Sequence, residues 1–108
     1  MSDPKAHLRY IYFMRPIDAD GRIKIGCSYK PARRLVTIAV HSPYQLEIIG
    51  VGKGSFPDEH LLHDYFEADR LHSEWFRSSP ELLEVIDLMG RGLTASDALD
   101  AVGRRAAA

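Results

Sequence analysis

Cysteine is almost absent from this sequence of 108 residues, since Cys27 is the only one. A single thiol cannot form an internal disulfide, so a small disulfide-stapled scaffold is excluded and a reducing compartment is favoured. Long apolar runs are lacking too, and none approaches the roughly 20 residues that a membrane-spanning helix needs. No apolar stretch follows the opening residues 1–5, so we expect no signal peptide, no membrane partner and a cytoplasmic location.

Net charge is also nearly absent, at −1, which by itself argues against a generic nucleic-acid binder. The charges are unevenly distributed, however. Residues 1–34 contain eight Lys and Arg against three Asp and Glu, whereas residues 35–108 contain six against twelve. A basic front half could meet a phosphate backbone, although on charge alone chance clustering in a short chain is the favoured explanation. With 45% hydrophobic and 27% charged residues, the chain has the composition of one ordinary globular domain with its own core.

Hydrophobic periodicity predicts the order ββαβαα, with a further short helix at the end, and therefore an α/β fold class of the α+β type. The first two strands should form a β-hairpin around the turn signal at residues 18–21. Ser55 lies three residues before an acidic residue and predicts the start of a helix. The predicted strands are residues 8–14, 22–27 and 44–51. The first predicted helix begins near Ser28 or Tyr29, has Pro31 in its first turn and is ended by residues 41–43, and the other predicted helices are 55–66, 81–89 and 94–102. Residues 69–78 are expected to form a loop, residues 1–7 a tail, 8–90 the domain, and 91–108 a capping helix with a frayed end.

Residues suited to phosphodiester hydrolysis are distributed over these elements. Such a reaction needs activated water, a cation for the developing phosphate charge, and a carboxylate that holds a metal. The hairpin should place Tyr12 near Lys24, and the helix that follows carries Arg34. Glu59 lies in the first turn of its helix, where the dipole favours an ionised carboxylate. At Gly26 a side chain would block a close approach of the backbone.

The order of these residues resembles the GIY-YIG nuclease superfamily, over residues 8–90. It is most similar to a phage- and prophage-associated branch whose second motif is Lys-Ile-Gly. Each motif is short, and the resemblance depends on their order and spacing. The motifs are Tyr10-Ile11-Tyr12, Lys24-Ile25-Gly26, Arg34 ten residues after Lys24, a helix with Glu59, Leu62, His63 and Phe66, and Glu74-Trp75-Phe76.

The resemblance implies a three-stranded antiparallel sheet flanked by helices, and cleavage that uses one metal ion. Tyr12 would help to deprotonate the attacking water, and Arg34, rather than its neighbour Arg33, would stabilise transition-state charge. Lys24, in place of a second tyrosine, would contact the scissile phosphate or lower the pKa of Tyr12; a solvated hairpin lysine is the alternative. Glu59 would bind Mg²⁺ or Mn²⁺.

His63 follows Glu59 by one turn, and it would contact phosphate or orient Glu59, or simply pack as a half-buried histidine. A zinc site is disfavoured because His60 and His63 are three residues apart, not four as in metalloproteases. Cys27 belongs to no Cys-x-x-Cys motif or matching triad that would support a role as a nucleophile. The Trp75-Phe76 pair is expected to pack the last helix against the sheet, with base stacking as the less favoured alternative.

The leading hypothesis from the sequence is therefore a DNA endonuclease dependent on a divalent metal. The first alternative is a catalytically inactive nucleic-acid-binding module of the same fold. The second is a protein-interaction domain, which would use the side of Glu74-Trp75-Phe76 or the C-terminal helix. DNA is the expected partner, together with a protein that supplies target specificity, and the sequence leaves the oligomeric state open.

Overall fold

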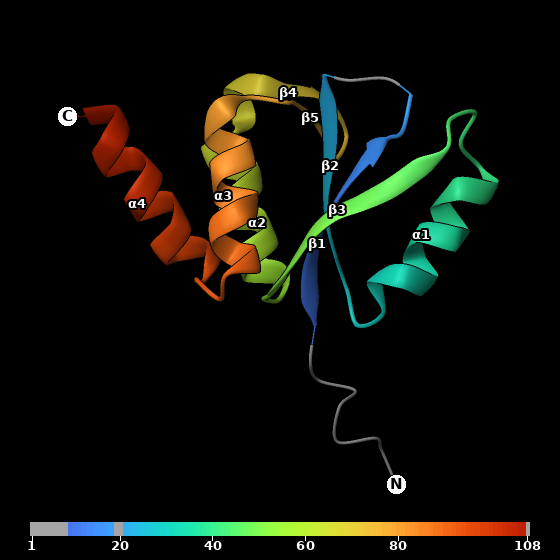
Figure 1. The fold of residues 1–108 in the computed structure, drawn as a ribbon, viewed down its shortest axis with the longest axis horizontal. Coiled ribbons are helices and arrows are strands. Elements are labelled where there is room, and N and C mark those ends of the chain that lie inside the picture. The colour runs from blue at the N-terminus through green and yellow to red at the C-terminus, as the bar shows by residue number, and fades with distance from the viewer. Residues whose placement is uncertain (1–8, 19–20, 108) are drawn as a thin grey trace, which may run out of the picture.

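The computed structural model describes residues 9–18 and 21–107, and the expected tail at residues 1–7 lies outside this range. Figure 1 shows the arrangement of its strands and helices. In chain order the elements are β1 (Tyr10–Pro16), β2 (Arg22–Ser28), α1 (Pro31–Val40), β3 (Leu46–Lys53), α2 (Phe56–Tyr65), the short 3₁₀ turn η2 (Glu67–Asp69), β4 (Arg70–His72), β5 (Trp75–Arg77), α3 (Pro80–Gly90) and α4 (Ala95–Ala107).

The five strands of the described residues form one antiparallel sheet in the order β3-β1-β2-β5-β4. The α+β class and the β1–β2 hairpin are confirmed, and Tyr12 pairs with Gly26. The expected three-stranded sheet and the order ββαβαα are wrong, because residues 70–77 form β4 and β5 instead of a loop. Strands of three residues are too short to show a periodicity, and β5 is stabilised by pairing with β2, far away in the sequence.

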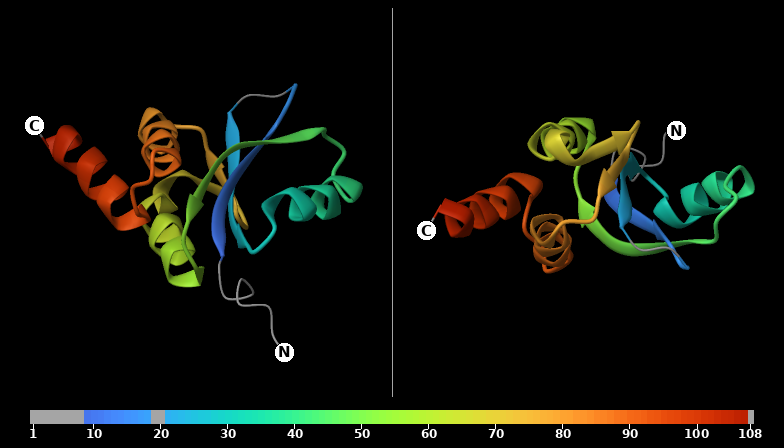
Figure 2. Two further views of the ribbon diagram at one scale, coloured as in Figure 1. Left: turned by 60° about the horizontal axis from the view of Figure 1, so that its bottom comes forward. Right: turned by 90° about the horizontal axis from the view of Figure 1, so that it is seen from above.

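Helices cover both faces of the sheet, as the two views of Figure 2 show, with α1 on one side and α2 and α3 on the other. Side chains alternate along each strand, so Ile11 and Phe13 point into the core beneath α2 and α3. Tyr12 and Met14 are equally buried but point to the α1 side, and all four side chains are at most 1% exposed. The first strand is therefore covered on both faces.

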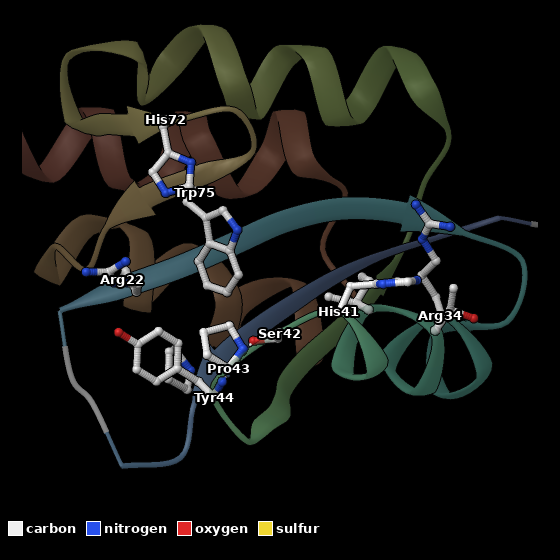
Figure 3. A pocket seen from close by; sticks show the side chains of 11 residues that line it. Arg22, Arg34, His41, Ser42, Pro43, Tyr44, His72 and Trp75 are labelled. Atoms are coloured by element: carbon white, nitrogen blue, oxygen red, sulfur yellow. Dashed lines mark hydrogen bonds between the residues drawn. The ribbon is translucent and has the colours of Figure 1, made fainter.

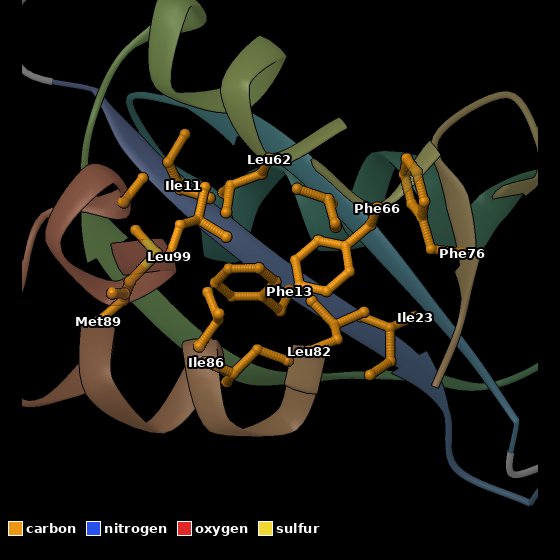
Figure 4. Packing of buried hydrophobic residues seen from close by; sticks show 14 of the residues in the cluster. Ile11, Phe13, Ile23, Leu62, Phe66, Phe76, Leu82, Ile86, Met89 and Leu99 are labelled. Atoms are coloured by element: carbon orange, nitrogen blue, oxygen red, sulfur yellow. The ribbon is translucent and has the colours of Figure 1, made fainter. Parts of the chain in front are cut away.

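The hydrophobic core lies between the sheet and α2, α3 and α4, as Figure 4 shows. Phe76 is fully buried there, but its neighbour Trp75 is only partly buried and faces the α1 side. The expectation that Trp75 and Phe76 pack together against a helix is therefore wrong for Trp75. The reason is the alternation along β5, which sends successive side chains to opposite faces.

The C-terminal helix α4 is longer than expected, because it continues through Gly103 to Ala107 instead of ending at Val102. A glycine within a helix costs only about 1 kcal/mol relative to alanine, and the alanines that follow favour the helix. The buried face of α4, which includes Ala98, Leu99 and Val102, belongs to the main core. Within the described residues, no helix combines the length and apolar character needed to cross a membrane.

The neighbours Leu82 and Leu83 on α3 give a direct test of this packing, since Leu82 is 0% and Leu83 44% exposed. We expect Leu82→Ala to lower the free energy of unfolding by about 2–5 kcal/mol through lost burial and a new cavity. Leu83→Ala, the matched control, should change it by no more than about 0.5 kcal/mol. Urea denaturation measures both values, and equal losses would contradict the orientation of α3.

Candidate active site

Tyr12 occupies a position that only a glycine partner permits. It pairs with Gly26 across β1 and β2, and a Cβ atom at Gly26 would lie 2.2 Å from both Cζ and Oη of the Tyr12 phenol. The ring therefore lies directly over the backbone of Gly26, and the phenol is 1% exposed. Gly26 therefore makes room for Tyr12 on the α1 side of the sheet.

Arg34 reaches Tyr12 from α1, and Pro31 lies in the first turn of this helix as expected. Burial raises the pKa of the Tyr12 phenol, and a hydrogen bond with the Arg34 side chain opposes this effect. The charge of Glu74 raises the pKa further, the charge of Arg34 lowers it, and the charge of Glu59 raises it. The phenol is therefore neutral near neutral pH. The sequence suggested that Lys24 lowers the pKa of Tyr12, but the residue that lowers it is Arg34.

Glu59 lies in the first turn of α2, where the helix start expected from Ser55 is confirmed by a 2.8 Å hydrogen bond from the Ser55 N–H to Asp58 Oδ2. Glu59 is only 7% exposed. Burial raises the pKa of its carboxyl group, and so does the charge of Glu74, against the lowering charges of His63, His60 and Lys24. The cost of burial thus outweighs the helix dipole that was expected to favour the ionised form.

Lys24 does not project freely from the hairpin, because its Nζ lies 2.5 Å from Oε2 of Glu74. The side chain of Lys24 is 12% exposed and that of Glu74 35%. Glu74 is a charged residue of this site to which the sequence assigned no chemical role. Its motif Glu74-Trp75-Phe76 was visible in the sequence, but no local pattern places it beside β2.

His63 contacts β2 at Ile25, next to the last pair between β2 and β5. Its Nε2 lies 3.0 Å from the carbonyl oxygen of Ile25 and donates to it, since a carbonyl can only accept. The N–H of Ile25 donates in turn to the carbonyl of Glu74 at 3.0 Å. The ring of His63 also packs against Phe76, with centroids 5.1 Å apart. One ring nitrogen of His63 therefore helps to hold α2 against β2.

Cys27 follows Gly26 on the same strand and is half-buried. Burial raises the pKa of its thiol, as do the carboxylates of Glu59, Asp58 and Glu74, against the charge of Arg9. A thiol of this kind stays protonated near neutral pH and is a poor nucleophile.

Two neighbouring cavities lie between α1 and the sheet, and Arg34 is the one candidate site residue among the described residues that line them. The larger has a volume of about 550 Å³ and the smaller about 350 Å³, and Arg34 lines both. Figure 3 shows the larger cavity, with Arg22 at one end and Arg34 at the other. Arg33, the competing candidate in the sequence, lines only the smaller cavity. No described residue that lines either cavity is acidic, so both present positive charge.

One family model matches the chain: that of the T5orf172 domain, over residues 9–90. The domain is associated with nuclease-like and DNA-binding functions in phage-related proteins. This match overturns the resemblance to the GIY-YIG superfamily that the sequence motifs suggested. Motifs of two or three residues cannot separate one family from another, whereas the family model covers most of the domain. No curated protein and no solved structure matches the chain.

The Tyr12–Gly26 contact predicts that Gly26→Ala is destabilising. A new methyl group would displace the phenol, and overpacking of this kind costs about 1–3 kcal/mol of unfolding free energy. Gly90→Ala is the matched control, because nothing lies within 4 Å of its added Cβ. It should leave the unfolding free energy equal or slightly higher. Urea midpoints compare the two variants, and identical midpoints would rule out the close contact.

The raised pKa of Glu59 predicts a variant that stabilises the protein. Because the folded state binds this proton more tightly than the unfolded chain, ionising Glu59 weakens folding at neutral pH. Glu59→Gln should therefore raise the free energy of unfolding near neutral pH. The gain should shrink as the pH falls through the raised folded pKa, and vanish below the ordinary value of 4.5. Denaturation as a function of pH measures it.

Glu81→Gln serves as the control for this experiment, because Glu81 is an exposed carboxylate in the first turn of α3. It should produce no comparable gain. A Glu59→Gln variant that is less stable than wild type near neutral pH would contradict the electrostatics described for this carboxylate.

Proposed function

The chain belongs to the T5orf172 domain family, and from this premise we propose that it is a divalent-metal-dependent endonuclease that hydrolyses DNA phosphodiester bonds. The nuclease-like and DNA-binding associations of the family support the reaction class. The observation that carries the proposal is electrostatic. The buried phenol of Tyr12 is hydrogen-bonded to Arg34 and feels the charges of both Arg34 and the buried carboxylate Glu59. Arg34 also lines the basic groove.

Glu59 is the proposed ligand of the metal ion. Its carboxylate is buried, and the charge of Glu74 makes ionisation more costly still. A divalent cation would remove this cost, since it favours the ionised form of both groups. Oxygen donors suit Mg²⁺ or Mn²⁺, and water and phosphate oxygens would complete the ligand set around one carboxylate. When bound, such an ion supplies positive charge to the phosphate and makes water more acidic.

Tyr12 and Arg34 act on the water and the phosphate in this proposal. The neutral phenol of Tyr12 orients the attacking water by hydrogen bonding, and the hydrogen bond with Arg34 holds its oxygen in place. Arg34 is exposed along one side of the groove, so its remaining N–H groups are available to phosphate oxygens. A planar fork of donors stabilises the charge that develops in phosphoryl transfer.

Lys24 and His63 act through other residues. The ammonium of Lys24 neutralises Glu74, which limits the repulsion between Glu74 and Glu59. His63 holds α2 on the β2 edge through the Ile25 carbonyl, and thereby keeps Glu59 close to Tyr12. Both are positioning residues in this proposal, and neither needs to touch the substrate.

Plasmid nicking in Mg²⁺ or Mn²⁺ tests the proposed enzyme. Glu59→Gln and Arg34→Ala should each lower the cleavage rate by about 10²–10³-fold, the typical effect of losing one group that stabilises the transition state. Chelation with EDTA should stop cleavage by the wild type. Glu81→Gln in the first turn of α3 and Arg91→Ala directly after its last residue remove the same kinds of charge away from the groove, and these variants should cleave as the wild type does.

Equal background cleavage by wild type and Glu59→Gln would end the enzymatic proposal. DNA binding that Arg34→Ala weakens, with a steep salt dependence and no cleavage, would leave the catalytically inactive binding module. Absence of both would leave the protein-interaction domain. Of the residues considered for that role, Phe76 and the apolar face of α4 belong to the core, whereas Glu74 and Trp75 stay partly exposed.

A further inference from the structure

We propose that the larger cavity between α1 and the sheet binds one unpaired nucleobase of a DNA substrate, stacked on Trp75. The proposal deepens the function proposed above, because it names the substrate class of the same site: DNA with an unpaired nucleotide next to the cleaved phosphate. The cavity has a volume of about 550 Å³, which lies in the roughly 300–1,000 Å³ range of small-molecule pockets.

An aromatic platform lies inside this cavity. Trp75 pairs with Lys24 in the sheet, so its indole projects on the same face as Tyr12. Figure 3 shows the indole extending toward Pro43 and Tyr44 on the loop that follows α1. Trp75 is only half-buried and Tyr44 is 51% exposed, so both rings have free surface. Aromatic side chains with exposed faces bind bases by stacking, with little dependence on base identity.

Charge complementarity selects a nucleotide over an uncharged apolar ligand. Arg22 and Arg34 line the cavity together with His41 and His72, and no described lining residue is acidic. A base stacked on Trp75 would bring its own phosphates toward the guanidinium groups of Arg22 and Arg34. Arg34 is shared between the cavity and the Tyr12 phenol, so the nucleotide in the cavity lies directly beside the proposed cleavage site.

The base must be unpaired because Trp75 lies inside a cavity and not on a protruding surface. In a duplex each base is covered on both faces by its neighbours, so an indole can stack only on a base that has left the helix. Single strands, frayed ends and flaps meet this requirement at little energetic cost. The structure thus favours DNA with single-stranded character over an intact duplex.

Trp75 is the only tryptophan in the chain, so its intrinsic fluorescence reports on this cavity alone. In EDTA, which prevents metal-dependent cleavage, a short single-stranded oligodeoxynucleotide should quench this fluorescence in a saturable way. The same strand with abasic residues keeps its phosphates but has no bases to stack. It should bind about 5- to 150-fold more weakly and cause little quenching. A duplex of the same sequence should quench less than the single strand.

Tyr44→Ala should weaken binding of the single strand several-fold, measured by the anisotropy of a labelled strand. Tyr65→Ala is the matched control, because Tyr65 is similarly exposed, at 46%, and does not line the cavity. Equal quenching by normal and abasic strands, equal quenching by duplex, or binding without quenching would each overturn the base pocket. Cleavage that depends on Glu59 would survive those outcomes, so failure of the pocket and failure of the nuclease are distinguishable.

Discussion

The contact between the Tyr12 phenol and the backbone of Gly26 is the constraint on which the site depends. A ring can lie across a neighbouring strand only where that strand has no side chain, and a Cβ at Gly26 would fall 2.2 Å from the phenol. The contact buries Tyr12 on the α1 side of the sheet and leaves its hydroxyl near Arg34. The contact matters both for the stability of the sheet and for the candidate site, because the register of the β1–β2 hairpin also orients the phenol.

Opposed charges govern the chemistry around this phenol. Burial and Glu74 make ionisation of Glu59 costly, while Lys24 neutralises Glu74 and Arg34 partly offsets the burial of Tyr12. Buried ionisable groups with such unfavourable electrostatics lower stability, and they are characteristic of functional sites. In the proposed function, a bound cation would offset the unfavourable charges of Glu59 and Glu74, and a phosphate would pair with Arg34.

The β4–β5 hairpin gives three successive residues three different environments. Glu74 reaches back to Lys24, Trp75 enters the cavity beneath α1, and Phe76 fills the core. One short hairpin thus connects the charged site, the proposed base pocket and the hydrophobic core. Because β5 pairs with β2 at Lys24, the proposed base pocket and the candidate site residues are supported by the same sheet.

Local sequence determined much of this protein. Residue type and spacing identified Tyr12, Arg34 and Glu59 as candidates, and the helix start at Ser55 and the first hairpin were predicted correctly, because these signals depend on close neighbours. Only the tertiary structure decided that β5 forms, because its hydrogen bonds come from a strand about 50 residues away. The Lys24–Glu74 ion pair has the same origin, and so does the split between Trp75 and Phe76. Short motifs also suggested the wrong family, since they omit the long-range pairing that joins them into one site.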